Sequence, residues 1–399
     1  MSEGRSMKRR VFLKSVGAVT VLVAGGAVWR AYDQGVYRAG EGPAYQPWKD
    51  WRKDSNNGPF ALVRAAILAA SPHNTQPWLF KVSDSAIEVY IDTGRNVGPL
   101  DPYLREEHIG IGCALENLML AATANGYHAT ATLFPGELKA ISPEPEQQLL
   151  ARVDLAPGKR VETEFYDAIP ERHTNRSEFL PRSPLPPQFI DTLGRLASNE
   201  PAVWIFLFTA DADRRKIAQI SSAANTEIYS DPAVDRSAER WIRTDWSAVQ
   251  KHRDGITLDD FGLPPITTGI AKMMPLWMLK WAASHGPLKE YSKLMLSAPL
   301  IGILAVKDRY DRDNCLLAGR IWQRAHLLAT AHGVAGRPCN EAVEMIDHEK
   351  ALGRLPLRAN LLGEILRNAT WQPTFVFYMG YPTLTAGPSP RRSAEAVTL

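Results

Sequence analysis

Apolar residues recur at helical spacing in two segments of the chain that resemble each other. Residues 112–127 align without gaps with residues 319–334, at an offset of 207 residues. In both segments the apolar positions lie three or four residues apart, which predicts a long, largely buried helix. Gly126 and Gly333 stand where these helices would end, because glycine readily adopts the left-handed conformation of a helix C-terminus. The alignment therefore indicates an internal repeat.

The segments before the two helices repeat as well, which argues against a chance likeness between two apolar helices. Apolar runs typical of buried strands cover residues 87–92 and 300–306. Further upstream, residues 68–80 have a rough counterpart in residues 196–206. A helix, a turn, a strand, a second strand and a long helix are thus predicted twice along the chain.

This repeat predicts an α+β fold made of two tandem lobes. The first lobe covers residues 55–150 and the second covers residues 165–399, with a proline-rich and acidic stretch near 135–170 between them. Trp78 of the first lobe aligns with Trp204 of the second. Two lobes of one fold can pack as the subunits of a homodimer do, so we expect an intramolecular pseudo-dimer and a monomeric protein.

The N-terminal residues 1–30 have the pattern of an export signal. A basic segment, residues 8–14, precedes residues 15–29, which carry no charge. That uncharged stretch is shorter than the ~20 residues needed to cross a bilayer, which favours a signal peptide over a membrane-spanning helix. The pair Arg9 and Arg10, followed by Val-Phe-Leu-Lys, resembles the twin-arginine export signal. The resemblance implies the twin-arginine translocase as a partner and a periplasmic or other extracytoplasmic location.

Two alternatives stay open for this segment. It can act as an ordinary secretory signal, and it can be retained as an uncleaved anchor, because Ala24-Gly25-Gly26 is a plausible cleavage site but not a strict Ala-x-Ala motif. The twin-arginine route carries folded proteins and is used mainly where a cofactor is inserted before export. A cofactor loaded in the cytoplasm is therefore expected.

Composition excludes several classes of function. The 399 residues include 46 Lys and Arg against 43 Asp and Glu, a net charge of +3, which lacks the basic surplus of a nucleic-acid-binding protein. Cys113, Cys315 and Cys339 show no Cys-x-x-Cys spacing, and the nine histidines include no His-Glu-x-x-His motif. We therefore expect no nucleic-acid partner, no disulfide framework and no metal site.

The first motif that carries candidate chemistry is the segment Ser71–Trp78, which follows an apolar helix and precedes a strand. Two prolines, Pro72 and Pro77, end the helix and stiffen the loop. The loop presents hydrogen-bonding side chains on Ser71, His73, Asn74 and Gln76. Such groups can satisfy the donors and acceptors of a planar heterocycle. The alternative is a well-capped turn next to a buried tryptophan.

The second motif is the polar segment 172–176, which reads Arg-His-Thr-Asn-Arg. Its two guanidiniums, imidazole and hydroxyl belong to Arg172, Arg176, His173 and Thr174, and together they suit a phosphate. A solvated basic face is the alternative. A further basic pair, Arg391 and Arg392, follows two prolines near the end of the chain, and by itself it could be an ordinary tail.

Together these segments resemble the FMN-dependent nitroreductase family. The Asn-x-Gln-Pro-Trp string corresponds to the flavin-contacting loop of that family, Arg-His-Thr-x-Arg to its phosphate-binding motif R-[HRS]-[ST]-x-[RK], and the C-terminal pair to a further phosphate contact. The resemblance covers most of residues 55–395 and implies a nitroreductase-like fold with FMN as the cofactor. The cofactor-binding residues it implies are Ser71, His73, Asn74, Gln76, Arg172, His173, Thr174, Arg176, Arg391 and Arg392.

The two motifs are distributed in an unusual way. In ordinary members one chain carries both, and two identical chains exchange them to build two sites. Here the first lobe keeps residues 74–78 and the second keeps residues 172–176, with Ser-Asn-Glu-Pro-Ala-Val-Trp where Asn-x-Gln-Pro-Trp belongs. One flavin per chain is therefore expected. The pattern resembles a two-lobed, degenerate subgroup best known from mycobacterial dormancy proteins.

The second lobe carries extra material at about residues 207–300. In the subgroup, segments that match Trp241-Ile242-Arg243 and Asp254-Gly255-Ile256 belong to an insertion that can form a lid over the flavin. The insertion also holds many large apolar side chains, including Met273, Met274, Trp277, Met278 and Trp281. These suit the packing of a lid, and a membrane-binding patch is the alternative.

The loop 336–340 follows the second long helix, and the resemblance implies that a backbone N–H from this loop lies beside flavin N5. Cys339 in this loop could then place a thiol near N5, and the alternative is a small, buried, apolar cysteine. No additional acid, base or nucleophile stands out, since the flavin itself carries the chemistry in this family.

Three classes of function follow from these patterns. The first is an exported FMN oxidoreductase that reduces an electron-poor small molecule, such as a nitroaromatic or a quinone, with a reductant that the sequence does not identify. The second is an FMN-binding or FMN-sequestering protein with little or no turnover. The third, a structural or partner-binding role without flavin, would require the paired arginine motifs to be incidental.

Overall fold

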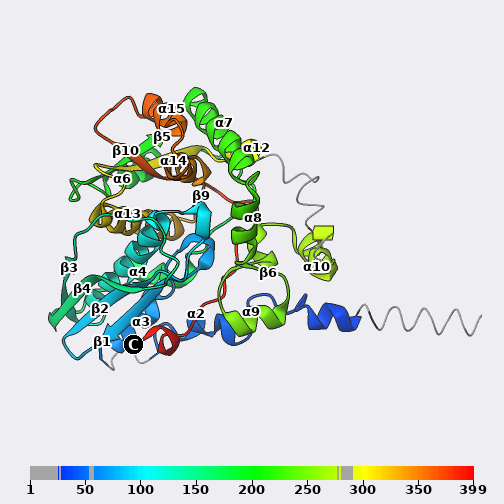
Figure 1. The fold of residues 1–399 in the computed structure, drawn as a ribbon. Coiled ribbons are helices and arrows are strands. Elements are labelled where there is room, and N and C mark those ends of the chain that lie inside the picture. Colours follow the sequence, from blue (N-terminus) through cyan, green and yellow to red (C-terminus); the bar gives the residue numbers. More distant parts are fainter. Residues whose placement is uncertain (1–25, 27, 54–57, 276–277, 280–290) are drawn as a thin grey trace, which may run out of the picture.

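The computed structural model describes residue 26 and residues 28–53, 58–275, 278–279 and 291–399 (Figure 1). Most of the predicted export signal, Trp277 and Trp281 lie outside the described residues. Helices and antiparallel sheets build two halves of the same design, which confirms the predicted α+β fold with two tandem lobes.

The first lobe contains a four-stranded antiparallel sheet in the order β1-β2-β4-β3. Its strands are β1 (Trp78–Val82), β2 (Ala86–Asp92), β3 (Tyr127–Leu133) and β4 (Gln147–Pro157). Burial alternates along β2 and β3, so that one face of the sheet packs on the core.

The second lobe repeats this order as β5-β8-β10-β9, again antiparallel. Its strands are β5 (Val203–Phe208), β8 (Leu300–Val306), β9 (Ala335–Pro338) and β10 (Gln372–Gly380). Every residue of β8 is buried, because helices cover both faces of this sheet (Figure 1). Its continuous apolar run, in contrast to the alternation in β2, is typical of a strand buried on both faces.

The helices follow the repeat as well. They are α2 (Gln46–Asp50), α3 (Phe60–Ala66), α4 (Arg105–Ala124), α5 (Glu164–Asp167), α6 (Pro187–Arg195), α7 (Asp211–Ile228), α8 (Pro232–Glu239), α9 (Trp246–His252), α10 (Pro265–Met273), α12 (Tyr291–Ser297), α13 (Arg312–Ala331), α14 (Glu341–Ala351) and α15 (Leu357–Leu366). The helices α4 and α13 begin and end 207 residues apart, which is the offset of the sequence repeat. They are the two long buried helices that the alignment predicts.

The helices α4 and α13 cross each other between the two sheets and form the centre of the molecule (Figure 1). Gly112 and Gly319, which align in the repeat, lie at this crossing. A Cβ atom on Gly112 would lie 2.1 Å from the carbonyl oxygen of Leu316, and one on Gly319 would lie 2.0 Å from that of Ile109. The shared glycine of the repeat is therefore a requirement of close helix packing.

Polar contacts also join the two halves at this crossing. Glu116 of α4 accepts hydrogen bonds from Arg320 (2.9 Å) and Arg324 (2.6 Å) of α13. Gln323 donates to Asn117 at 2.8 Å, and both side chains are fully buried. Because buried polar groups need partners, these pairs favour one register between the helices.

The aligned tryptophans differ in their surroundings. Trp78 begins β1 and is fully buried, whereas 53% of Trp204 in β5 is exposed. Both residues lie on edge strands of their sheets, but Thr398 near the C-terminus adds a bridge to Phe80 of β1. The two lobes are thus alike in topology but differ at the sheet edge.

The boundary between the lobes differs from the prediction. Strand β4 continues to Pro157, beyond residue 150, and it lies inside the stretch 135–170 that the sequence suggested as a connection. Leu150, Val153 and Leu155 of β4 are buried against the core. The sequence patterns did not predict this strand, because prolines and acidic residues flank it, although its own apolar positions alternate.

The additional material of the second lobe lies between β5 and β8, where the first lobe has only the short turn 83–85. It contains α7, α8, α9, α10 and α12 and two short parallel strands, β6 (Ile242–Arg243) and β7 (Ile256–Thr257). Among the described residues, no helix combines the length and the apolar composition needed to cross a membrane.

The C-terminal arm leaves β10 and returns to the first lobe (Figure 1). Arg391 N–H donates to Ala44 O at 2.7 Å, and Leu399 N–H donates to Phe80 O at 2.7 Å. Trp48 donates its indole N–H to Ser389 O at 2.7 Å. The arm thus carries residues of the second lobe across to the loop that precedes β1.

Candidate functional site

The loop between α3 and β1 contains three non-glycine residues in the left-handed backbone region. The φ angles are 43° at His73, 57° at Asn74 and 52° at Gln76. Each such residue costs on the order of 1–3 kcal/mol and persists only where its surroundings fix it, which is a common feature of binding sites. The loop that the Asn-x-Gln-Pro-Trp string predicted is therefore held in a shape that its own sequence does not favour.

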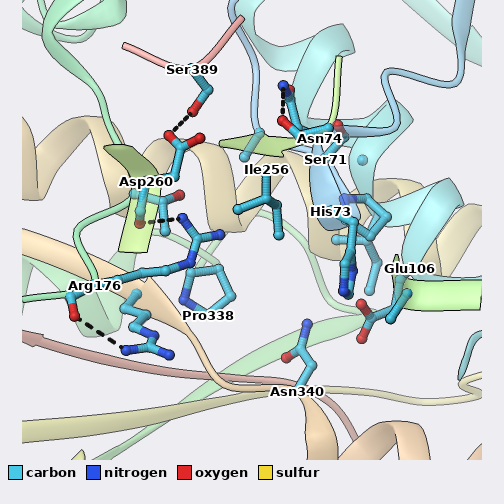
Figure 2. Close-up of a pocket in the computed structure, with 18 of the residues that line it drawn as sticks. Ser71, His73, Asn74, Glu106, Arg176, Ile256, Asp260, Pro338, Asn340 and Ser389 are labelled. Atoms are coloured by element: carbon cyan, nitrogen blue, oxygen red, sulfur yellow. Dashed lines mark hydrogen bonds between the residues drawn. The ribbon is translucent and has the colours of Figure 1, made fainter. Parts of the chain in front are cut away.

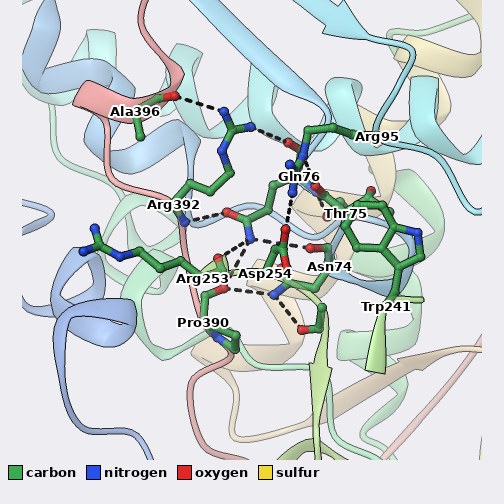
Figure 3. Close-up of polar contacts among 12 residues, drawn as sticks. Asn74, Thr75, Gln76, Arg95, Trp241, Arg253, Asp254, Pro390, Arg392 and Ala396 are labelled. Carbon is green, nitrogen blue, oxygen red and sulfur yellow. Dashed lines mark hydrogen bonds and ion pairs between the residues drawn. The ribbon is translucent and has the colours of Figure 1, made fainter. Parts of the chain in front are cut away.

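The Asn74 side chain fixes this loop through two remote segments (Figure 3). Its Nδ2 donates to Gly255 O (3.0 Å) and to Pro390 O (2.9 Å), and its Oδ1 accepts from Arg391 (2.7 Å). The backbone N–H of Gly255 donates to Asn74 O at 3.2 Å. Asn74 lies at the wall of the cavity described below, and its amide joins the insertion and the C-terminal arm to the loop.

Gln76 and Arg392 fasten the arm to the same loop. Gln76 donates to Arg253 O (2.9 Å) and accepts from the backbone N–H of Arg392 (2.8 Å). The Arg392 guanidinium donates to Gln76 O and to Ala396 O. Both residues lie outside the set of described residues that line the cavity. Their role as cofactor contacts stays a prediction, although backbone atoms already satisfy their side chains.

Among the buried arginines of the described residues, Arg172 and Arg391 are the two that have no carboxylate partner. Arg172 is 2% exposed and Arg391 is 3% exposed, and neither forms an ion pair within the described part of the chain. Arg172 donates to Leu68 O (3.0 Å), and Arg391 donates to Ala69 O (3.0 Å), so both guanidiniums bind the end of the helical segment that starts with α3. The Nε atoms of both are buried without a hydrogen-bond partner.

Burial lowers the pKa of Arg172 to about 10, and burial together with the positive charge of Arg172 lowers the pKa of Arg391 to about 9. Both groups stay protonated at neutral pH. An unpaired buried cation is costly, and a bound anion would offset that cost.

The rest of the Arg-His-Thr-Asn-Arg segment divides between the cavity and the core. Thr174 and Arg176 line the cavity, and Arg176 donates to Asp260 O at 3.2 Å. Burial lowers the pKa of Arg176. His173 packs edge-on against Trp48, with ring centroids 4.7 Å apart, and is not among the described residues that line the cavity. The role of His173 as a direct cofactor contact therefore stays a prediction.

A cavity of about 340 Å³ lies where these segments meet (Figure 2). The loop 71–74 of the first lobe and the segment 172–176 of the second lobe both line it. The insertion contributes Ile256, Asp260 and Phe261, and the C-terminal arm contributes Ser389 and Arg391. Cavities of this size are typical of small-molecule sites, and this one is built from both lobes.

Of the residues predicted to bind a cofactor, the structure brings together Ser71, His73, Asn74, Arg172, Thr174, Arg176 and Arg391 at this cavity. Ser71 Oγ accepts from the backbone N–H of Gln76 at 3.1 Å, which leaves its hydroxyl proton to donate. Burial lowers the pKa of His73 to about 4, so its ring is neutral at physiological pH.

The insertion is held over the loop by a buried ion cluster (Figure 3). Asp254 pairs with Arg95 of the first lobe (2.5 Å) and with Arg243 (2.6 Å). Trp241 donates its indole N–H to Asn96 O at 2.9 Å, and Arg95 lies over the Trp241 ring. The Trp-x-Arg and Asp-Gly segments thus form one latch between the insertion and the first lobe.

Cys339 does not supply a thiol to the cavity. Its side chain is buried in the second lobe next to Tyr291 and Met295, and burial raises the pKa of its thiol well above the usual range. Its backbone N–H donates to Val376 O at 2.8 Å. Its neighbours Pro338 and Asn340 line the cavity instead, because successive side chains point to opposite sides here.

Several cavity residues gave no recognisable sequence signal. Trp322 and Phe375 line the cavity from α13 and β10, and Glu106 and Glu344 line it from α4 and α14. Asn340 accepts from the backbone N–H of Val376 (2.9 Å), which leaves its Nδ2 without a partner among the described residues. From the spacing of apolar residues and the helical pattern, such residues are expected in the core. Only the packing of the two lobes shows that they line a cavity.

The donor set fits the phosphate of FMN. Two buried guanidiniums without a carboxylate partner, Arg172 and Arg391, and a hydroxyl, Thr174, line the cavity, and guanidiniums bind phosphate oxygens strongly. Within the described residues, no group of three or more His, Cys, Asp or Glu side chains could hold a metal ion.

Comparison with known proteins identifies relatives over most of the chain. The protein named "Putative NAD(P)H nitroreductase Rv3131" from Mycobacterium tuberculosis is 25% identical over 344 residues, which cover 84% of this chain and 89% of that protein. Over most of its length the chain is thus similar in sequence to a protein named as a nitroreductase. A second relative from M. tuberculosis, "Putative NAD(P)H nitroreductase acg", is 33% identical to this chain over 124 residues, which cover 30% of this chain and 35% of that protein. No family model matches the chain.

Solved structures of nitroreductases align with part of this chain. The FMN-dependent nitroreductase NfnB from Mycobacterium smegmatis, solved in complex with NADPH, is 18% identical, with a TM-score of 0.35 over 59% of this chain and 97% of that chain. A nitroreductase with bound FMN from Desulfitobacterium hafniense is 14% identical, with a TM-score of 0.33 over 57% of this chain and 94% of that chain.

Proposed function

We propose that this chain is an FMN-binding oxidoreductase of the nitroreductase type that reduces an electron-poor small molecule, such as a nitroaromatic or a quinone. The observation that carries the proposal is the pair of buried guanidiniums, Arg172 and Arg391, which lack an anionic partner in the described structure and lie at a cavity between the lobes. FMN, when bound, supplies the two-electron redox chemistry.

The residues of the chain bind and orient the cofactor in this proposal. Arg172, Arg391 and Thr174 would hold the phosphate, and Arg176 would add a guanidinium on the same wall. Ser71 and Asn340 each have a proton left to donate to a carbonyl or nitrogen of a heterocycle. Apolar side chains of the insertion and of the helix crossing, among them Ile256, Phe261 and Trp322, would exclude water.

The electron balance requires a reductant of a definite class. Reducing a quinone to a quinol consumes two electrons and two protons. A reduced nicotinamide, the class that appears in the names of the M. tuberculosis relatives, gives a hydride with two electrons and one proton, and water supplies the second proton. If the protein is exported, a membrane-linked donor is the alternative, because nicotinamides are scarce outside the cytoplasm.

Replacing both cavity guanidiniums tests cofactor binding. The purified wild type should be yellow, and Arg172→Ala with Arg391→Ala should lose its FMN, because removing charge-assisted phosphate contacts costs about 1.5–3 kcal/mol each. Flavin absorbance after gel filtration measures the occupancy. Arg195→Ala removes one charge from the surface, where the side chain is 79% exposed, and should keep the cofactor. A colourless wild type that cannot be reconstituted with FMN would overturn the proposal.

FMN sequestration with little turnover is the second candidate, and the latch favours it. The insertion lines the cavity and is fixed to the first lobe through Asp254, Arg95 and Arg243. Photoreduced holoprotein should be mixed with a panel of quinones and nitroaromatics under anaerobic conditions. Slow reoxidation by every acceptor would support storage, whereas fast reoxidation by one of them would support the enzyme. Asp254→Asn should accelerate FMN release if the latch retains it.

Export and subgroup are part of the same proposal. We propose that the chain belongs to the two-lobed, single-flavin subgroup and leaves the cytoplasm by the twin-arginine route, on the evidence of Arg9 and Arg10 and of the divided motifs. Replacing both arginines by lysine should retain the full-length protein in the cytoplasm, as cell fractionation would measure. Continued export of the double-lysine variant would favour an ordinary secretory signal instead.

A further inference from the structure

One part of the cavity wall is acidic. Glu106 from α4 and Glu341 and Glu344 from α14 line the cavity, and we call these three residues the acidic wall. Figure 2 shows Glu106 and Arg176 on opposite sides of the cavity. The phosphate-binding role proposed above uses the guanidiniums, so it leaves the acidic wall without a function.

Glu344 is the member of the acidic wall that most clearly lacks a partner. Its side chain is 6% exposed, and its Oε2 is buried without a hydrogen bond among the described residues. Burial raises its pKa well above the usual range, and the neighbouring charges of Glu106 and Glu341 raise it further. A buried carboxylate beside two others is costly unless a cation or a donor compensates it.

Guanidiniums of the protein compensate only part of this wall. Arg337 lines the cavity near Glu341, whose charge raises the pKa of that guanidinium. The neighbouring charges that shift the pKa of Glu344 most are Glu106, Glu341, Asp101 and Arg105. Arg105 donates to Glu106 (3.2 Å), but its Nε binds Asp347 at 2.7 Å and another nitrogen binds the backbone of Thr374. Among these neighbours of Glu344, Arg105 is the one cation, and it is already shared between two carboxylates.

The neighbouring members of the wall are fixed in position. Glu341 accepts a hydrogen bond from Tyr291, and Glu106 is held by Arg105. Asp235 extends the row of carboxylates from α8 of the insertion, where its side chain is exposed while still lining the cavity. Carboxylates therefore line the cavity from the surface to its buried end, which attracts a positively charged ligand.

We infer that the acidic wall binds a cationic group, such as a protonated amine, on the molecule that this protein reduces. The inference rests on the proposed function and specifies its substrate class. An ammonium group offers several N–H donors, which matches the carboxyl groups of Glu106 and Glu344 at the cavity wall. The guanidiniums on the opposite side of the cavity would disfavour binding of a cation on that side and would bind the phosphate of FMN.

A matched series of nitroaromatics tests this inference on the FMN-loaded protein. The compounds 4-nitrobenzylamine, 4-nitrobenzyl alcohol and 4-nitrobenzoate carry a cation, a neutral group and an anion at one position. Photoreduced holoprotein should be reoxidised at least about tenfold more efficiently by the amine than by the alcohol, and least by the benzoate, where tenfold corresponds to about 1.4 kcal/mol.

A binding measurement gives a second readout that does not depend on turnover. Benzylamine, which has no reducible group, should perturb the flavin absorbance of oxidised holoprotein, and its Kd should rise about tenfold in Glu344→Gln. Glu364→Gln removes the same charge from an exposed position on α15 and should leave the Kd unchanged. The comparison of amine with alcohol in the wild type decides the question even if the Glu344 variant does not fold.

The outcomes separate this inference from the function on which it rests. Equal efficiencies for amine and alcohol, or equal binding of benzylamine and benzyl alcohol, would overturn the cationic substrate class while the oxidoreductase stands. A preference for the alcohol would show that the wall acts through protonated carboxyl groups and would also overturn it. A wild type that binds no FMN would overturn the proposed function itself.

Discussion

Buried arginines in this protein fall into two groups that differ in their partners. Arg105 and Arg309 share the buried carboxylate of Asp347, at 2.7 Å and 2.9 Å. Arg172 and Arg391 have hydrogen bonds to backbone carbonyls but no carboxylate within the described residues. The first group is compensated within the fold and serves stability, whereas the second group leaves positive charge at a cavity wall and points to an anionic ligand.

Asp347 provides the first prediction, at the scale of one residue. Burial by itself would raise its pKa, but Arg105 and Arg309 outweigh burial and hold the pKa below the ordinary value. Asp347→Asn leaves two buried guanidiniums without a carboxylate, so the free energy of unfolding at pH 7 should fall by about 3–5 kcal/mol. Urea unfolding measures this change.

The same residue predicts a pH dependence. Because the pKa of Asp347 is lower in the folded than in the unfolded state, its contribution is complete above the unfolded pKa and is lost as the pH falls through the folded pKa. The stability difference between wild type and Asp347→Asn should therefore shrink in acid. Asp154→Asn, in an exposed pair with Arg152, should cost less than about 1 kcal/mol at any pH. Equal effects of the two variants would contradict this account.

At the scale of elements, the repeat predicts the long helices and the buried strands correctly. Apolar spacing identifies α4, α13, β2 and β8, because each buries a continuous face or stripe. The same patterns miss β4, whose proline-rich flanks resemble a linker. The spacing of apolar residues also does not indicate that Trp204 is exposed whereas Trp78 is buried. The burial of an edge strand depends on which other segments of the chain pack against it.

The helix crossing gives the second prediction. A methyl group at Gly319 would collide with the backbone of α4, so Gly319→Ala should lower the free energy of unfolding by about 1–3 kcal/mol through overpacking. Gly363 in α15 has open space around it, and Gly363→Ala should raise stability by up to about 1 kcal/mol through helix propensity. Chemical denaturation of both variants measures the contrast. Destabilisation by both would show that the crossing is not specific.

At the scale of the whole molecule, segments far apart in the sequence together line one cavity. The loop 71–74, the segment 172–176, the insertion at 255–261 and the C-terminal residues 389–391 meet at the cavity. Each lobe supplies a different part, and the pseudo-symmetric position lacks the matching motifs. The two lobes therefore act together as one binding unit.

This asymmetry predicts the stoichiometry of the protein. The full-length protein should bind one FMN per chain and should behave as a monomer of 44.2 kDa, because the pseudo-dimer interface lies within the chain. Flavin released by heating, quantified against protein concentration, and light scattering measure the two values. Two FMN per chain would show that the second position also binds, and one FMN per dimer would show that the site needs a partner chain.

Local patterns along the chain predicted the two long helices, the strands at 87–92 and 300–306 and the two motifs, but not β4. The repeat, the Asn-x-Gln-Pro-Trp loop and the Arg-His-Thr-x-Arg segment are local patterns, which can be identified from the order of residues along the chain. Tertiary structure decided which of those side chains face the cavity. Gln76, His173 and Arg392 bind within the fold, and Glu344 turns toward the cavity, because such orientations depend on packing between residues far apart in the chain.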